Sequence, residues 1–250
     1  MKTYETSPPV TGVRNADVGE GIAVANAGWS FAGDAAAKFS AHVRRSVPRY
    51  EDGHDIICKL SDFFVRDDSV AYEVGTSVGE LLAKLAARHA HRGARWIGID
   101  IERDMVERAE EAVALYPRAR AELADAITYD FDKSDLIVAY YCLQFVPPKH
   151  RQHVINTIYE ALEWGGAFIW FEKVRACDAR FQDIFNLLYI DYKLEQGYAP
   201  EEIVAKGRSL KGVMEPFSSE GNRDLLARAG FVDVLSVFKH LCFEGILAIK

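Results

Sequence analysis

The residues of this chain best suited to chemistry stand where predicted strands end. Glu73 closes a short apolar strand over 69–74, and glycines follow at Gly75 and Gly79. Gly75 lets the backbone turn without a Cβ penalty, and Gly79 lets the next helix pack closely. Glu73 then points into the crevice where open parallel sheets bind ligands. We interpret this stretch as the nucleotide-binding corner of an α/β domain; a purely structural strand-turn-helix is the alternative.

Two more carboxylates stand at corresponding places. Asp100 ends the second predicted strand, 27 residues after Glu73, where a carboxylate can accept hydrogen bonds from both ribose hydroxyls. Asp125 ends the third strand, and Ala126 beside it offers a backbone N–H to an adenine ring. A helix cap for Asp100 and a simple loop role for Asp125 are the alternatives.

A pair of tyrosines, Tyr140 and Tyr141, ends the fourth predicted strand. An aromatic ring can hold a cation against its negative face, and a phenol can orient a second reactant. Packing at the sheet edge is the other explanation for both rings.

The alternation of strands and helices predicts the sheet that positions these residues. Strands that alternate with helices form a parallel sheet with helices on both faces. Two final strands are joined too tightly for a crossover helix, so they must pair antiparallel. We therefore expect an α/β fold with five parallel strands and a C-terminal antiparallel hairpin. The parallel strands are expected near 69–74, 96–100, 120–124, 136–140 and 167–171, and the hairpin at 231–238 and 241–249.

Three segments make up the expected domain organisation. Residues 1–28 lack periodicity and form an N-terminal arm. Residues 29–66 contain two helices that would cover the carboxyl ends of the strands as a lid. Residues 67–250 form the ligand-binding domain, with a helical insertion at about 174–214.

Composition excludes several classes of function. The 250 residues carry a formal net charge of -7, which offers no overall attraction to nucleic acids or anionic lipid. The four cysteines are scattered without metal-ligand spacing, which indicates reduced thiols in a cytoplasmic protein and no metal site. No apolar run is long enough to span a bilayer. We expect a small-molecule substrate, no direct nucleic-acid partner and no membrane partner.

The Glu-x-Gly-x-x-x-Gly pattern resembles motif I of the class I S-adenosylmethionine-dependent methyltransferases. From about residue 29 onward the sequence is more specifically similar to the carboxy-S-adenosylmethionine synthase group of that superfamily. The similar pieces are Trp29-Ser30-Phe31, Arg45-Ser46-Val47-Pro48-Arg49-Tyr50, Gly75-Thr76-Ser77, Leu143-Gln144-Phe145, Gly165-Gly166-Ala167, Glu172-Lys173, Phe185-Asn186, Asp191-Tyr192-Lys193, Gly197-Tyr198 and Val213-Met214.

The resemblance implies S-adenosylmethionine, or its carboxylated form, as cofactor, and a homodimer with the inserted helices as contact. Glu73 would contact the methionine amino end, and the tyrosines of the fourth strand would lie nearest the sulfonium. The expected cofactor-binding residues are Tyr50, Glu73, Gly75, Thr76, Ser77, Gly79, Asp100, Ile101, Asp125, Ala126 and Tyr140. The candidate catalytic residues are Tyr140, Tyr141, Tyr198 and Arg208.

The sequence also departs from the family pattern. Glu73, Thr76 and Tyr140 stand where the family has aspartate, cysteine and asparagine. The family arginine that pairs with the carboxylate on the modified sulfonium falls at Gly207 without a gap, or at Arg208 after a one-residue shift. An arginine suits that role because its planar fork binds a carboxylate bidentately.

Three reactions fit these observations. We rank first methyl transfer from S-adenosylmethionine to a small acceptor. The second is carboxy-S-adenosylmethionine synthesis with prephenate, a step that the resemblance associates with tRNA wobble uridine modification. The third is an intramolecular reaction of the bound sulfonium. A non-catalytic binding module is the alternative outside enzymes.

Overall fold

Seven strands form one sheet in the order β5-β4-β3-β6-β7-β9-β8 in a computed structural model that describes residues 16–31 and 33–250. Five neighbouring strands run parallel, and β9 pairs antiparallel with β7 and with β8. The parallel strands are β3 (Val70–Val74), β4 (Arg95–Asp100), β5 (Ala119–Leu123), β6 (Ser134–Tyr140) and β7 (Leu162–Lys173), and the hairpin strands are β8 (Asp233–His240) and β9 (Phe243–Ile249). The predicted fold class is confirmed. The hairpin strands begin two residues later than predicted, and Leu241 adopts a positive φ in the turn between them.

Helices cover both faces of the sheet, because each face carries its own apolar core. On one face, Leu82 and Ile57 pack with Ala71 and Val138 of the central strands. On the other face, Ile155 and Leu226 pack against strand residues whose side chains point to that side of the sheet. Central parallel strands are expected to be buried on both sides in this way. The first core involves α2 (Tyr50–Ser61), α3 (Glu80–Arg88) and α4 (Arg103–Val113), and the second α5 (Pro148–Ala161) and α8 (Ser219–Ala229).

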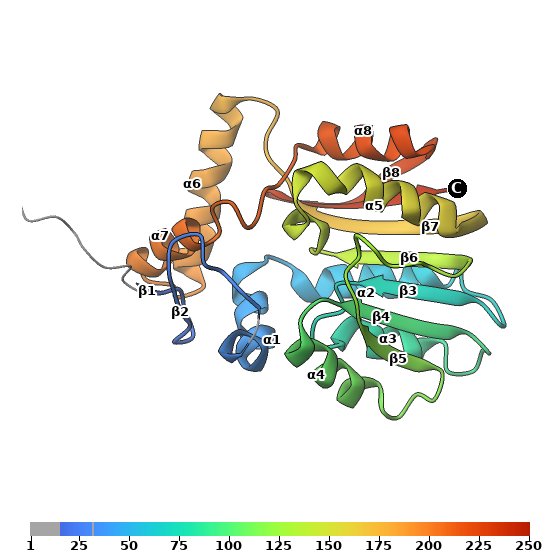
Figure 1. Cartoon of the computed structure of the whole chain (residues 1–250). Coiled ribbons are helices and arrows are strands. Elements are labelled where there is room, and N and C mark those ends of the chain that lie inside the picture. Colours follow the sequence, from blue (N-terminus) through green and yellow to red (C-terminus); the bar gives the residue numbers. More distant parts are fainter. Residues whose placement is uncertain (1–15, 32) are drawn as a thin grey trace, which may run out of the picture.

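A smaller group of elements gathers at the left-hand end of the sheet in Figure 1. It comprises α1 (Asp34–Ser46), the short strands β1 (Ala16–Asp17) and β2 (Ala23–Val24), and α7 (Pro200–Ser209). Backbone bonds from Ala27 N to Arg208 O (3.0 Å) and from Trp29 N to Ser209 O (3.3 Å) tie the end of the predicted arm to α7. The part of that arm before residue 16 lies outside the described residues.

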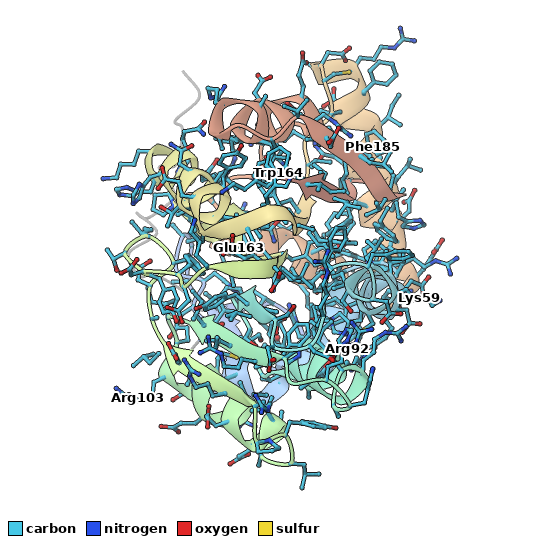
Figure 2. The ribbon with its side chains drawn as sticks, turned by 90° about the vertical axis from the view of Figure 1, so that its right-hand side faces the viewer. Lys59, Arg92, Arg103, Glu163, Trp164 and Phe185 are labelled. Carbon is cyan, nitrogen blue, oxygen red and sulfur yellow. The ribbon has the colours of Figure 1, made fainter. Side chains whose placement is uncertain are left out.

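Helix α6 (Ala179–Glu195) stands apart from these layers, next to α7 (Figure 1). None of its residues is fully buried, and six large apolar side chains along it are exposed. Figure 2 views the molecule from the opposite end of the sheet, where Glu163 and Trp164 lie near the start of β7. Among the residues that the structure describes, no helix has the length and apolar character needed to cross a membrane.

Candidate functional site

A cavity of about 990 Å³ opens at the carboxyl ends of β3, β4 and β6, beneath α1 and α7. One part is lined by the turn after β3 together with the ends of β4 and β5, and the other by α1, α6, α7 and the end of β7. The lid prediction placed helices before β3 over this edge, and the cavity-lining residues Phe39, His42, Val43 and Ser46 of α1 lie there.

The glycine turn after β3 brings bare backbone to the cavity. Gly75 has a φ of +74°, and a Cβ there would lie 2.3 Å from Cys142 Sγ, so only glycine fits. The N–H groups of Gly75 and Thr76 both donate to the carbonyl of Ile99, at 2.8 and 3.0 Å, which fixes the turn against β4. Ser77 follows with a positive φ and also lines the cavity.

Glu73 is a buried carboxyl group at the cavity wall with 3% of its surface exposed. One oxygen accepts a hydrogen bond from Thr76 Oγ1 at 2.7 Å. Burial raises the pKa of Glu73 to about 8, because no cation among the described residues compensates its charge. An incoming ammonium would supply that compensation, so the site fits the expected contact with the amino group of a methionine moiety.

Asp100 and Asp125 hold the next two strand ends in shape. Asp100 accepts from Ser77 N at 2.9 Å and from Glu102 N at 3.0 Å, and burial raises its pKa. Asp125 accepts from Ile127 N at 2.9 Å. Each carboxylate therefore also shapes its own loop, but Asp100 does not cap α4, whose N-cap residue is Glu102. Both also line the cavity, as do Ile101 and Ala126.

Three tyrosines enclose the central part of the cavity. Tyr140 donates to the carbonyl of Tyr50 at 2.6 Å, which joins the end of β6 to the start of α2. The ring of Tyr140 lies 5.1 Å from that of Tyr50 and 4.5 Å from that of Tyr141. Tyr141 adopts a φ of +57°, a strained backbone for a bulky residue, and its buried hydroxyl has no partner among the described residues.

Three predicted residues lie outside the cavity lining. Gly79 caps α3, and a Cβ there would lie 2.7 Å from Ala109 Cα, so this glycine serves the close packing of α3 on α4. Tyr198 is buried against α1, where its hydroxyl lies 3.0 Å from Ser46 Oγ. Arg208 is exposed, whereas its neighbour Gly207 lines the cavity.

Lysines that sequence reasoning did not single out line the second part of the cavity. Lys173 ends β7, Lys193 lies in the last turn of α6, and Lys206 lies in α7. Lys173 and Lys193 belong to similar pieces noted above, but a single lysine in a helix or at a strand end does not differ from a surface lysine in sequence. Only their shared cavity sets them apart.

One carboxylate and imidazole cluster is already occupied by cations. Glu51, His54 and Glu80 bring their ligand atoms within 4.8 Å of one another. However, Lys84 bonds to Glu51 and His54, and Arg44 bonds to Glu80 at 2.9 Å. We therefore assign no metal ion to this cluster, since ammonium and guanidinium groups already neutralise its carboxylates.

Comparisons with known proteins agree with this geometry. Residues 71–166 match a methyltransferase domain family. A carboxy-S-adenosyl-L-methionine synthase of Staphylococcus epidermidis is 34% identical over 223 residues, which cover 89% of this chain and 97% of that protein. The synthase of Sulfurimonas denitrificans is 33% identical over 228 residues, covering 89% and 94%. An O-methyltransferase family protein from Burkholderia thailandensis shares the fold with a TM-score of 0.62 at 16% identity, over 88% of this chain and 61% of that one.

The shared fold and the extent of the sequence similarity identify the cofactor and the class of enzyme. The cofactor is S-adenosylmethionine, and the chain is a transferase that depends on it. A buried acid, a glycine turn and strand-end carboxylates line the cavity where such a cofactor would bind. The chain belongs to the carboxy-S-adenosyl-L-methionine synthase family within the class I S-adenosylmethionine-dependent methyltransferases.

Proposed function

We propose that this enzyme transfers the methyl group of S-adenosylmethionine directly to a small-molecule acceptor. The observation that carries the proposal is the cavity wall at Gly207. The family resemblance places at Gly207, or at Arg208 after a one-residue shift, the arginine that pairs with a carboxylated sulfonium methyl. Gly207 offers no side chain, and Arg208 is exposed outside the cavity lining. The planar guanidinium fork suited to that carboxylate is therefore missing at this position of the wall, and Arg175, which follows β7, is the arginine that lines the cavity elsewhere.

The residues that would hold the cofactor come from the parallel strands. Glu73 would receive the methionine ammonium, Gly75 would place its backbone against the adenosyl group, and Asp100 would accept from the ribose hydroxyls. The cofactor supplies a methyl group that is already electrophilic, so the protein needs to align the acceptor with the S–CH3 bond and exclude water.

The aromatic enclosure supports that alignment. Tyr50, Tyr140 and Tyr141 line the cavity and pack against one another. A sulfonium held against an aromatic ring gains a cation–π attraction, which disappears once methyl transfer leaves the sulfur neutral. The hydroxyl of Tyr141 is buried, so the surrounding rings would have to shift before it could donate to an acceptor.

Carboxy-S-adenosylmethionine synthesis from prephenate is the second candidate. It is favoured by the relatives of that name at 34% and 33% identity, which match the chain over 89% of its length. In that reaction an anionic product needs cationic partners, and Arg175 or the cavity lysines would have to take the place of the family arginine. An intramolecular displacement on the methionine chain is a third reaction that the same tyrosine enclosure allows.

Mass spectrometry of the small molecules released from the purified enzyme separates these reactions. The enzyme is incubated with S-adenosylmethionine, with and without prephenate, and then denatured. We expect unmodified S-adenosylmethionine in both samples, and its demethylated product once an acceptor is present. A prephenate-dependent mass of S-adenosylmethionine plus a carboxyl group would overturn methyl transfer as the main reaction. The Asp100→Ala variant is the control for specific retention of the nucleotide.

Arg208 and Gly207 offer a matched pair of variants for the same assay. Arg208→Ala leaves the cavity wall unchanged, so we expect unaltered product formation. Gly207→Arg introduces the fork into the cavity lining, and we expect it to obstruct acceptor binding or to favour a carboxylated cofactor. Loss of all activity in Arg208→Ala would contradict the proposal.

We also propose that the enzyme is a cytoplasmic homodimer that uses α6 as contact. Exposed apolar side chains on α6 include Phe181, Ile184, Leu187 and Leu188, with exposed fractions of 44–63%. A second copy of the chain would remove this surface from water, as homodimer interfaces commonly do. The cysteines Cys58, Cys142, Cys177 and Cys242 are all free, which agrees with a reducing compartment.

A further inference from the structure

The N-terminal hairpin, formed by β1 and β2, carries a carboxylate that is held by residues of the cavity cover. The hairpin lies beside α7 at the left-hand end of Figure 1. In its turn, Glu20 accepts hydrogen bonds from Arg45 and from Nδ1 of His42, both on α1. The hydroxyl of Tyr198, two residues before α7, lies 3.4 Å from Glu20 Oε1. Only 11% of the Glu20 side chain is exposed, so this carboxylate is fixed between α1 and the start of α7.

The turn of the N-terminal hairpin fits closely against the Tyr198 ring. Its residues Gly19, Glu20 and Gly21 all have positive φ, at 104°, 54° and 68°. A Cβ at Gly19 would lie 2.3 Å from Cε1 of Tyr198, so only glycine fits there. A Cβ at Gly21 would lie 3.6 Å from Lys38 Nζ, which is an ordinary contact. The shape of the turn therefore serves the contact that Gly19 makes with Tyr198.

The partners of Glu20 reach the cavity itself. His42 lines the cavity from α1, and its Nε2 accepts a hydrogen bond from Lys206, which lines the cavity from α7. Burial lowers the pKa of His42 to about 4, so the neutral imidazole can accept from Lys206 while it donates to Glu20. Trp29 also lines the cavity and belongs to one small hydrophobic cluster with Val18 of the hairpin. A movement of the N-terminal hairpin would therefore change the cover of the cavity.

The N-terminal hairpin has little stability of its own. Each of its strands has two residues, and a lone two-stranded hairpin is marginally stable in water. Its hydrophobic cluster of Val18, Ile22 and Trp29 is separate from the two larger clusters on the faces of the sheet. Segments with few buried apolar contacts are the ones that open locally while the rest of a protein stays folded. The hydrogen bonds of Glu20 therefore decide how long this hairpin stays closed.

We propose that the N-terminal hairpin is a latch that holds α1 and α7 together over the cavity and opens when the cofactor is exchanged. Glu20 is the positioning residue that keeps the latch closed. When its hydrogen bonds to His42 and Arg45 break, the hairpin and Trp29 can move away from α7, and the cavity opens between α1 and α7. The latch would serve each of the three candidate reactions, because in each of them the cofactor must enter and its product must leave.

Hydrogen exchange and ligand-exchange kinetics of Glu20→Gln test the latch. The substitution keeps the shape of the side chain and removes the charge from its hydrogen bonds to Arg45 and His42. The N–H groups of Val18 and Ile22 are hydrogen-bonded within the closed hairpin, at 2.9 and 3.1 Å, and we expect them to exchange with solvent about tenfold faster in the variant. Labelled S-adenosylhomocysteine, chased with unlabelled ligand, should dissociate about tenfold faster, with no decrease in its association rate.

Two glycines of the same turn provide a matched pair of variants. Gly19→Ala places a Cβ against the Tyr198 ring, so hydrogen exchange in the hairpin and ligand dissociation should both become faster. Gly21→Ala adds a Cβ at a positive φ without that clash, so both rates should rise less. Glu107→Gln is the control for loss of a carboxylate, because Glu107 is exposed on α4 outside the cavity lining, and both rates should stay unchanged.

The two rates distinguish a latch from a hairpin with a purely structural role. The amides of β3 and β6, at the centre of the sheet, should exchange at wild-type rates in every variant, which shows that the variants are folded. If the hairpin of Glu20→Gln exchanges faster while S-adenosylhomocysteine dissociates at the wild-type rate, the hairpin does not control access and the latch is wrong. If the hairpin exchanges at the wild-type rate, Glu20 does not hold it closed. Equal increases in Glu107→Gln would also overturn the proposal.

Discussion

Replacing Gly75 with alanine tests how the turn after β3 forms the cofactor site. A Cβ at Gly75 would lie 2.3 Å from Cys142 Sγ and 2.5 Å from Cys142 Cβ. The backbone at Gly75 also has a φ of +74°, which side chains other than glycine adopt with strain. Either the turn or the segment after β6 must therefore move, and both line the cavity.

The expected magnitude has two parts that a control variant separates. The left-handed backbone costs about 1–2 kcal/mol for a residue with a Cβ. Overpacking against Cys142 adds about 1–3 kcal/mol. Gly165 has a similar φ of +79°, but a Cβ there would meet nothing within 4 Å. Gly165→Ala should therefore lose only the backbone cost of about 1–2 kcal/mol. Gly75→Ala should lose both costs, about 2–5 kcal/mol in total.

Urea unfolding of the two variants measures these costs, and calorimetric titration with S-adenosylmethionine measures the consequence for the site. We expect Gly75→Ala to bind the cofactor at least tenfold more weakly and Gly165→Ala to bind it normally. The second change Cys142→Gly, made in Gly75→Ala, should restore part of the stability because it removes both clashing atoms. If Gly75→Ala is no less stable than Gly165→Ala and binds the cofactor with wild-type affinity, the assignment of this turn is refuted.

Three other predictions concern charge, the lid and assembly. Burial raises the pKa of Glu73 from 4.5 to about 8, so between these pH values the folded state holds a proton that the unfolded state has released. The free energy of unfolding should therefore fall as the pH rises from 4.5 to about 8. Urea unfolding at pH 5 and pH 8 should show a smaller loss in Glu73→Gln, and parallel losses would contradict the shift. Tyr140→Phe removes the hydrogen bond to the Tyr50 carbonyl and should lower the free energy of unfolding by about 0.5–1.5 kcal/mol in the same assay. An unchanged free energy of unfolding would show that this hydrogen bond does not hold α2 in place. Leu187→Glu should convert a dimer to a monomer in analytical ultracentrifugation. Leu115→Glu is the control, because Leu115 is 87% exposed but lies outside α6, and this variant should stay dimeric. If both variants are dimers, α6 is not the contact.

Much of the site could be predicted from sequence because parallel strands bring their carboxyl ends to one edge. Glu73, Asp100 and Asp125 each close a strand in sequence, and in the structure all three line one cavity. Alternating apolar strands and helices also determined the sheet, since such strands must be buried on both faces. Gly79 was placed correctly in the turn, but its closest packing is against α4, a contact between helices that local sequence does not encode.

The second half of the cavity was decided by tertiary structure. In an α-helix, neighbouring residues point in directions about 100° apart, so Gly207 can line the cavity while Arg208 faces away. When an alignment can shift by one residue, the sequence does not determine which of the two residues faces the cavity. Lys173, Lys193 and Lys206 are spread over 34 residues of chain and converge only because α6 and α7 fold back over the end of β7. The sequence determined a cofactor-binding sheet, and the packing of the inserted helices decided which charges face its substrate.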